Sequence, residues 1–147
     1  MISRHQITSI LLLVWFGLST SVGWGAKPES IDWVDEYSAA RRAGIAQDRP
    51  VLLFVTTDGC THCDRMIDGT FQDANVIDAL ADDFVPAQIK LSPADELAKQ
   101  LKVTLFPTTI IISTEGKILD YARGYLSANQ LHQRLDAAAT VRIASAE

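Results

Sequence analysis

Cys60 and Cys63 are the residues of this sequence whose type and spacing best fit a chemical reaction. They are the only cysteines in the chain, and two residues separate them. This spacing places both thiols on the first turn of a predicted helix, close enough for a disulfide to open and close without movement of the fold. We therefore hypothesise a reversible redox pair.

The start of a helix predicts different roles for the two thiols. Backbone N–H groups and the helix dipole favour negative charge there, so the Cys60 thiolate should be stabilised and act as the nucleophile. Cys63 lies about one turn further in, should be more buried, and is placed to attack the mixed disulfide and release the partner. His62 can donate a hydrogen bond to the Cys60 thiolate, which would make the disulfide a stronger oxidant. Alternatively, His62 is a solvated surface residue without effect on the potential.

Other uses of the cysteines fit the sequence less well. A structural disulfide normally bridges distant segments, because closing so short a loop removes little chain entropy. A tetrahedral zinc site needs one more ligand than Cys60, His62 and Cys63 supply, and no second pair lies elsewhere. Covalent haem needs a histidine directly after the second cysteine, where this chain has Asp64. We therefore expect no metal and no separate organic cofactor.

Residues 1–25 have the order of a secretory signal peptide. Arg4 precedes an apolar run at residues 10–18, and small and polar residues follow as far as Gly25. The alternative is an uncleaved membrane anchor, but the run is short of the roughly 20 residues that span a bilayer. We predict cleavage after Gly25, or within a few residues of it, and a mature domain at residues 26–147 without a stable membrane anchor.

The charge balance limits the possible partners. The formal net charge of the 147 residues is −5, and it becomes −6 when the leader departs with Arg4, its one charged residue. An acidic domain is poorly suited to nucleic acid or to anionic membrane surfaces. Export would place the cysteines in the periplasm or outside the cell, where a disulfide can persist.

Four predicted strands would position the cysteines. The apolar run at residues 51–56 does not alternate, which is typical of a central strand covered on both faces. The cysteine motif follows its carboxyl end, where sites in α/β sheets are usually built. Further strands are expected at residues 85–91, where Pro86 favours an edge position, and at residues 108–112 and 118–123 as an antiparallel hairpin.

Helices are predicted at residues 30–44, 63–84, 92–101 and 127–140. Ser30, Ser92 and Ser127 are the expected N-caps, Gln130 completes a capping box with Ser127, and Gly69 interrupts the second helix. The alternation of helices and strands predicts one α/β domain, with a central mixed sheet of about four strands and helices on both faces.

Together these features resemble the thioredoxin superfamily. The apolar strand, the Cys-Thr-His-Cys motif opening a helix, and Phe106 and Pro107 before the third strand carry the resemblance, which covers residues 31–139. It implies a thioredoxin fold and exchange of disulfides with cysteine-containing protein substrates and a redox partner protein. It also implies that Pro107 is a cis-proline packed against the cysteines. The backbone of Phe106 would then be available for hydrogen bonds with an extended substrate strand. The alternative is a trans proline at a strand start.

Within the superfamily, two similarities point in opposite directions. The segments 33–46 and 66–76 are similar to exported proteins related to the C-terminal domain of the electron-relay protein DsbD. The histidine before the second cysteine instead resembles the oxidase DsbA and protein disulfide isomerases. The direction of electron flow therefore stays open.

The chain also departs from the family at two positions. Gly59 stands where thioredoxins usually carry a tryptophan, so no large side chain directly precedes the first cysteine. Phe54 replaces the family's buried acid. Proton transfer to and from Cys63 would then need His62, a neighbouring aspartate or water.

We predict an exported thiol–disulfide oxidoreductase with Cys60, Cys63 and His62 as catalytic residues, and with Phe106 and Pro107 in contact with substrate. One alternative is a thioredoxin-like binding or chaperone module with little catalysis, which the two departures would favour. Another is a periplasmic metallochaperone that hands on copper or zinc.

Overall fold

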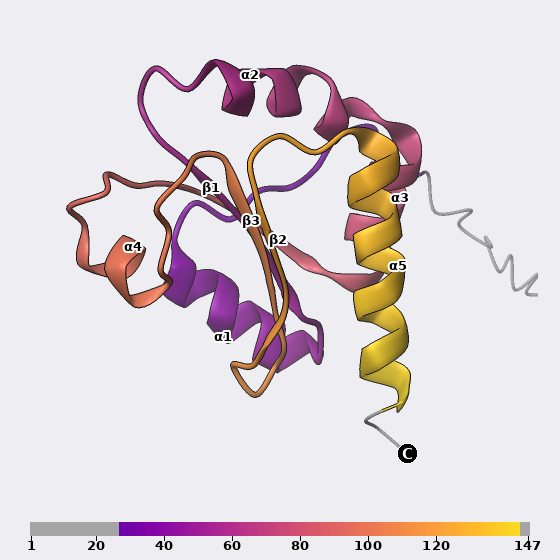
Figure 1. The fold of residues 1–147 in the computed structure, drawn as a ribbon. Coiled ribbons are helices and arrows are strands. Elements are labelled where there is room, and N and C mark those ends of the chain that lie inside the picture. The colour runs from indigo at the N-terminus through magenta and orange to yellow at the C-terminus, as the bar shows by residue number, and fades with distance from the viewer. Residues whose placement is uncertain (1–26, 145–147) are drawn as a thin grey trace, which may run out of the picture.

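The structure is a computed structural model that describes residues 27–144, with the backbone alone at 142–144. The predicted signal peptide at residues 1–25 lies outside the described residues. Residues 27–144 form one four-stranded mixed sheet, as the sequence predicts, and its strands lie in the order β2-β1-β3-β4 (Figure 1). Its strands are β1 (Val51–Thr56), β2 (Val85–Lys90), β3 (Thr108–Ile112) and β4 (Ile118–Arg123).

The central strand β1 carries the candidate site at its carboxyl end. It runs parallel to β2 and antiparallel to β3, with Leu53 opposite both Ala87 and Ile110. Every residue of β1 is buried, because helices cover both faces of the sheet. This explains the apolar run without alternation. β2 lies at an edge of the sheet, which agrees with its proline.

Within residues 27–144, five α-helices and one short 3₁₀ helix surround the sheet. They are α1 (Tyr37–Gln47), α2 (Thr61–Asp68), η1 (Thr70–Gln72), α3 (Ala74–Asp83), α4 (Glu96–Gln100) and α5 (Ala128–Ala144). Two hydrophobic clusters show which face each covers: α1 and α4 pack on one face, and α2, α3 and α5 on the other. Figure 1 shows α2 across the end of the sheet, above the carboxyl end of β1. No helix within residues 27–144 has the length and apolar character to cross a membrane.

The predicted start of the first helix at Ser30 is wrong. The backbone at Val34 is extended and pairs with the outer edge of β2, donating to Pro86 O at 3.0 Å and accepting from Gln88 N at 2.9 Å. The helix begins after Glu36, whose carboxylate accepts from the first-turn amides of Ser38 and Ala39. A tertiary strand partner therefore overrides the local helical pattern.

The helix predicted from Ser92 is also shorter than expected. The carboxylate of Asp95 accepts a hydrogen bond from the Ser92 amide at 2.7 Å, which closes a turn before the helix. Asp95 holds the N-cap position of α4 without a side-chain capping hydrogen bond, and the helix ends before Leu101.

The last helix agrees with its prediction. The Ser127 hydroxyl accepts from the Gln130 amide, and the Gln130 side chain accepts from the Ser127 amide at 2.9 Å. This reciprocal pair is the predicted capping box. The predicted buried stripe is also present, since Leu131, Leu135 and Ala138 are all buried.

Candidate active site

Cys60 and Cys63 are joined by a disulfide at the N-terminus of α2. Cys60 is the N-cap of the helix and is partly exposed, whereas Cys63 is 2% exposed and belongs to the core cluster under α2. The prediction that Cys63 is the more buried of the two is confirmed. A disulfide in this position offers one sulfur to a partner and keeps the other inside.

Backbone groups of the helix surround the outer sulfur. The Cys63 N–H donates to Cys60 Sγ at 3.2 Å, and the Cys63 and Asp64 amides both donate to the Cys60 carbonyl. These donors lie at the positive end of the helix dipole. After reduction, the same end of the helix favours a thiolate on Cys60 over one on Cys63.

The peptide bond between Phe106 and Pro107 is cis, as predicted. Two hydrogen bonds fix this loop: Thr108 Oγ1 donates to Leu105 O at 2.6 Å, and the Gly124 amide donates to Pro107 O at 2.7 Å. Pro107 is buried. The Phe106 side chain is half-buried and packs against both core clusters, one of which contains Cys63 and also contacts Cys60. The structure therefore places Phe106 against the same core as the disulfide.

Phe54 stands in an aromatic cluster within that same core. Its ring centroid lies 4.7 Å from Phe71 and 6.2 Å from Trp33, and the Trp33 and Phe71 rings meet edge to face at 4.9 Å. Phe54 is fully buried. The core that holds Cys63 is thus apolar at the position where the family has a buried acid.

The polar residues beside the disulfide are all exposed. His62 lies on the outer side of α2, and its ring centroid is 6.4 Å from that of Tyr125. Asp58 accepts a hydrogen bond from Lys90 Nζ at 2.7 Å, and this contact raises the pKa of Lys90. Asp64 is exposed in the first turn of α2.

Sequence reasoning missed three residues of the rim, by which we mean the surface around the active-site helix start and the Pro107 loop. They are Leu105, Tyr125 and Arg65. Leu105 is 50% exposed and Tyr125 is 37% exposed, although both side chains are large and hydrophobic. Arg65 places its guanidinium carbon 4.6 Å from the centre of the Tyr125 ring. A signal was available, because Leu105 directly precedes Phe106 and Tyr125 lies two residues after the predicted strand at residues 118–123.

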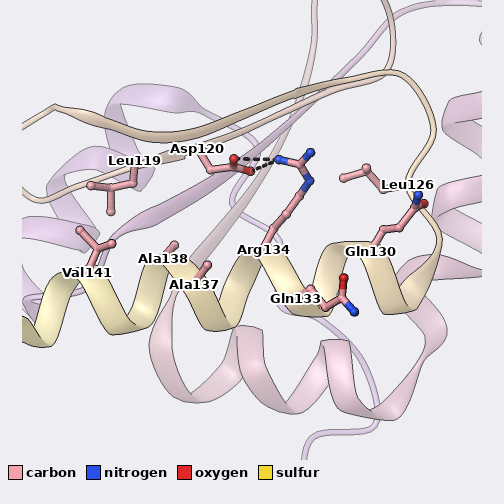
Figure 2. Close-up of a pocket in the computed structure, with 9 residues that line it drawn as sticks. All are labelled: Leu119, Asp120, Leu126, Gln130, Gln133, Arg134, Ala137, Ala138 and Val141. Carbon is pink, nitrogen blue, oxygen red and sulfur yellow. Dashed lines mark hydrogen bonds and ion pairs between the residues drawn. The ribbon is translucent and has the colours of Figure 1, made fainter.

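A large groove lies elsewhere, between α5 and β4 (Figure 2), with a volume of about 440 Å³. Arg134 crosses it and donates to both carboxylate oxygens of Asp120, at 2.7 and 2.9 Å. Neither cysteine lines it. Within residues 27–144, no group of three or more histidine, cysteine or acidic residues is arranged to hold a metal ion.

Known proteins are similar to this chain in sequence and in fold. The thioredoxin-like domain family matches residues 37–139. The thiol:disulfide interchange protein DsbD of Ralstonia nicotianae is 35% identical over an alignment of 102 residues, and the match covers 63% of this chain and 17% of DsbD. The chain therefore spans only a small part of the curated relative that it matches.

Solved structures share the fold. A thioredoxin from Thermus thermophilus has a TM-score of 0.70 at 22% identity, covering 80% of this chain and 94% of that one. The reduced C-terminal domain of Neisseria meningitidis DsbD has a TM-score of 0.58 at 21% identity, covering 67% and 90%. These similarities confirm the predicted thioredoxin fold. With a family match over most of its length and a close cysteine pair at the start of α2, the chain belongs to the thioredoxin-like family of disulfide oxidoreductases.

Proposed function

We propose that this protein is an exported thiol–disulfide oxidoreductase that exchanges disulfides with cysteine-containing proteins through Cys60. One observation carries the proposal: the disulfide has a partly exposed sulfur at the N-cap of α2 and a buried sulfur one turn later. A purely structural crosslink has no need of this asymmetry, whereas a two-step exchange depends on it.

In the reducing direction, the Cys60 thiolate attacks one sulfur of a substrate disulfide. The substrate S–S bond breaks, one substrate thiolate leaves, and Cys60 is joined to the other half. Cys63 then loses its proton and its thiolate attacks Cys60 Sγ, which releases the second substrate thiolate and forms the Cys60–Cys63 disulfide. The substrate has gained two electrons, which this protein has lost.

The reverse sequence oxidises a substrate dithiol and leaves Cys60 and Cys63 reduced. In either direction a redox partner protein must restore the starting state. Because Phe54 supplies no carboxylate, we assign the proton exchange of Cys63 to His62 or to water.

The loop at Pro107 supports a substrate site beside Cys60. Its hydrogen bonds to Thr108 and Gly124 hold it rigid, and no loop hydrogen bond among the described residues uses the Phe106 backbone. An extended substrate segment could pair with this backbone as an added strand does. Phe106 and Pro107 would then orient the substrate cysteine toward Cys60.

Export is part of the proposal. The leader-like order of residues 1–25 supports it, as does the similarity to DsbD. Expression of the full chain in a bacterial host, followed by cell fractionation and N-terminal sequencing, tests it. We expect periplasmic protein that begins near Ala26; intact protein in the cytoplasm would contradict export.

The activity is tested with the purified protein in both directions, by reduction of insulin and by oxidation of a reduced, unfolded substrate. We expect turnover in at least one direction and its loss in Cys60→Ser. Absence of turnover in both directions would exclude the oxidoreductase function.

A second candidate function is a binding module, which the exposed side chains of Leu105 and Tyr125 favour; the Tyr125 ring centroid lies 6.4 Å from that of His62. Exposed apolar side chains of this kind often mark interaction sites. Binding of unfolded protein that is equally tight in a variant with both Cys60→Ser and Cys63→Ser would support this function. Binding that requires a free thiol would support exchange.

A further inference from the structure

The contact between Arg65 and Tyr125 joins two parts of the rim beside the disulfide. Arg65 belongs to α2, two residues after Cys63, and its guanidinium carbon lies 4.6 Å from the Tyr125 ring centre. This is within the range of a cation–π interaction. Tyr125 follows Gly124, whose amide is bonded to Pro107 O. Tyr125 thereby joins Arg65 to the segment that is hydrogen-bonded to the Pro107 loop.

The helix α2 carries one arginine and two aspartates. His62 and Arg65 are three residues apart and share the face toward Tyr125, which both side chains approach. Asp64 and Asp68 are four residues apart, and Asp68 is also three residues after Arg65, so it neighbours the arginine as well. The nearby Asp58 is paired with Lys90. Arg65 is the one arginine or lysine of α2, in a chain that carries a formal charge of −5.

Arg65 is exposed and forms no ion pair with any carboxylate among the described side chains. Stacking on an aromatic ring uses the face of a guanidinium and leaves its edge N–H groups able to donate. These donors match the two oxygens of a carboxylate. The ring also restricts the side chain, so less freedom remains to be lost when a carboxylate binds.

We propose that Arg65, held over Tyr125, selects protein substrates that carry an acidic residue beside the reacting cysteine. The inference rests on the proposed function, because it assigns the substrate class of the same site. Arg65 acts in binding, and Tyr125 is a positioning residue that acts through Arg65.

The test compares three peptides that differ in the residues flanking one cysteine, which are Glu, Gln or Lys. Each cysteine is capped as a mixed disulfide with 2-mercaptoethanol, and the reduced protein opens it in single-turnover mixing. The Cys60 thiolate attacks the mixed disulfide, and Cys63 completes the exchange. Selectivity is the second-order rate constant for the Glu peptide divided by that for the Lys peptide. The Gln peptide serves as the neutral reference. We expect a ratio of roughly fivefold in favour of Glu at low salt, decreasing as salt is added.

The variants separate a charge effect from a structural one. Arg65→Gln should bring the ratio close to one, and Arg65→Glu should invert it, which loss of packing alone would not do. Tyr125→Ala should lower the ratio, and Tyr125→Phe should retain it. The matched control is Arg123→Gln, because Arg123 also stacks on a tyrosine ring, at 5.2 Å from Tyr121, but at the end of β4. This control should retain the ratio of the unmodified protein.

The failures are distinguishable. If the Gln peptide reacts but the unmodified protein shows no preference for Glu, this inference is wrong and the oxidoreductase function stands. Equal loss of selectivity in the variants at Arg65 and Arg123 would also overturn it. If no peptide reacts, the proposed function fails and the inference fails with it.

Discussion

The backbone amide of Cys63 donates to the sulfur of Cys60 at 3.2 Å, while the side chain of Cys63 is only 2% exposed. One residue thus contributes both a donor toward the outer sulfur and the buried sulfur of the pair. The two cysteines are therefore not interchangeable, and their single variants should behave differently.

Cys63→Ser should trap substrates, whereas Cys60→Ser should not. Without Cys63, a mixed disulfide at Cys60 has no internal thiolate to resolve it, so covalent adducts accumulate. Without Cys60, the remaining thiol is too buried to meet a protein partner. Non-reducing gels and mass spectrometry of each variant after incubation with a disulfide-bonded protein provide the measurement. More adduct with Cys60→Ser than with Cys63→Ser would reverse the assignment of nucleophile and resolving thiol.

His62→Ala should make the disulfide less oxidising. If His62 stabilises the reduced form, its loss lowers the reduction potential by about 20–30 mV, which corresponds to a stabilisation of roughly 1 kcal/mol. Equilibration with glutathione measures the potential. His132→Ala is the control, because His132 lies on α5 and contacts Asp136. An unchanged potential in His62→Ala, or an equal change in both variants, would show that His62 does not tune the pair.

The sheet was predictable because its signals are local. The strand β1 is buried on both faces and therefore reads as an unbroken apolar run, and the turn at Gly116 joins β3 to β4 in antiparallel register. The start of α1 was not predictable from local pattern. Val34 is extended because it bonds to β2, a partner that lies far along the chain.

The same distinction between local signals and tertiary contacts applies to the candidate site. Cys60, Cys63 and Pro107 could be identified because their spacing and residue types carry the chemistry, although their roles stay predictions. The contact between Arg65 and Tyr125 could not, since it depends on how α2 lies against the loop after β4. Only the assembled fold brings these two side chains together.

Acid should weaken the turn between β3 and β4 through Glu115. A hydrogen bond from Thr114, and a second from Ser113, lower the pKa of Glu115 from 4.5 to about 2. A carboxyl whose folded pKa is depressed stabilises the fold above its unfolded value, and this contribution is lost as pH falls from about 4.5 toward 2. Thermal unfolding of Glu115→Gln should therefore begin lower than that of the unmodified protein at pH 6 and converge with it near pH 2.5. Thr114→Val should reproduce part of the effect, and a constant difference at all pH values would contradict this origin.

Restoring the family's acid with Phe54→Asp should destabilise this chain. The change removes a ring that contacts both Phe71 and Trp33 and buries a carboxyl in an apolar core. Loss of a buried aromatic side chain costs about 3–5 kcal/mol, and burial of an unpaired polar group adds to this cost. Urea unfolding of the oxidised protein measures the loss, with Phe54→Leu as the control that removes the ring but keeps an apolar side chain. We expect Phe54→Leu to lose clearly less. Equal stability of Phe54→Asp and the unmodified protein would mean that water or a polar partner reaches the acid in the core beneath Cys63. The aromatic cluster would then not exclude proton transfer to and from Cys63 through a buried acid.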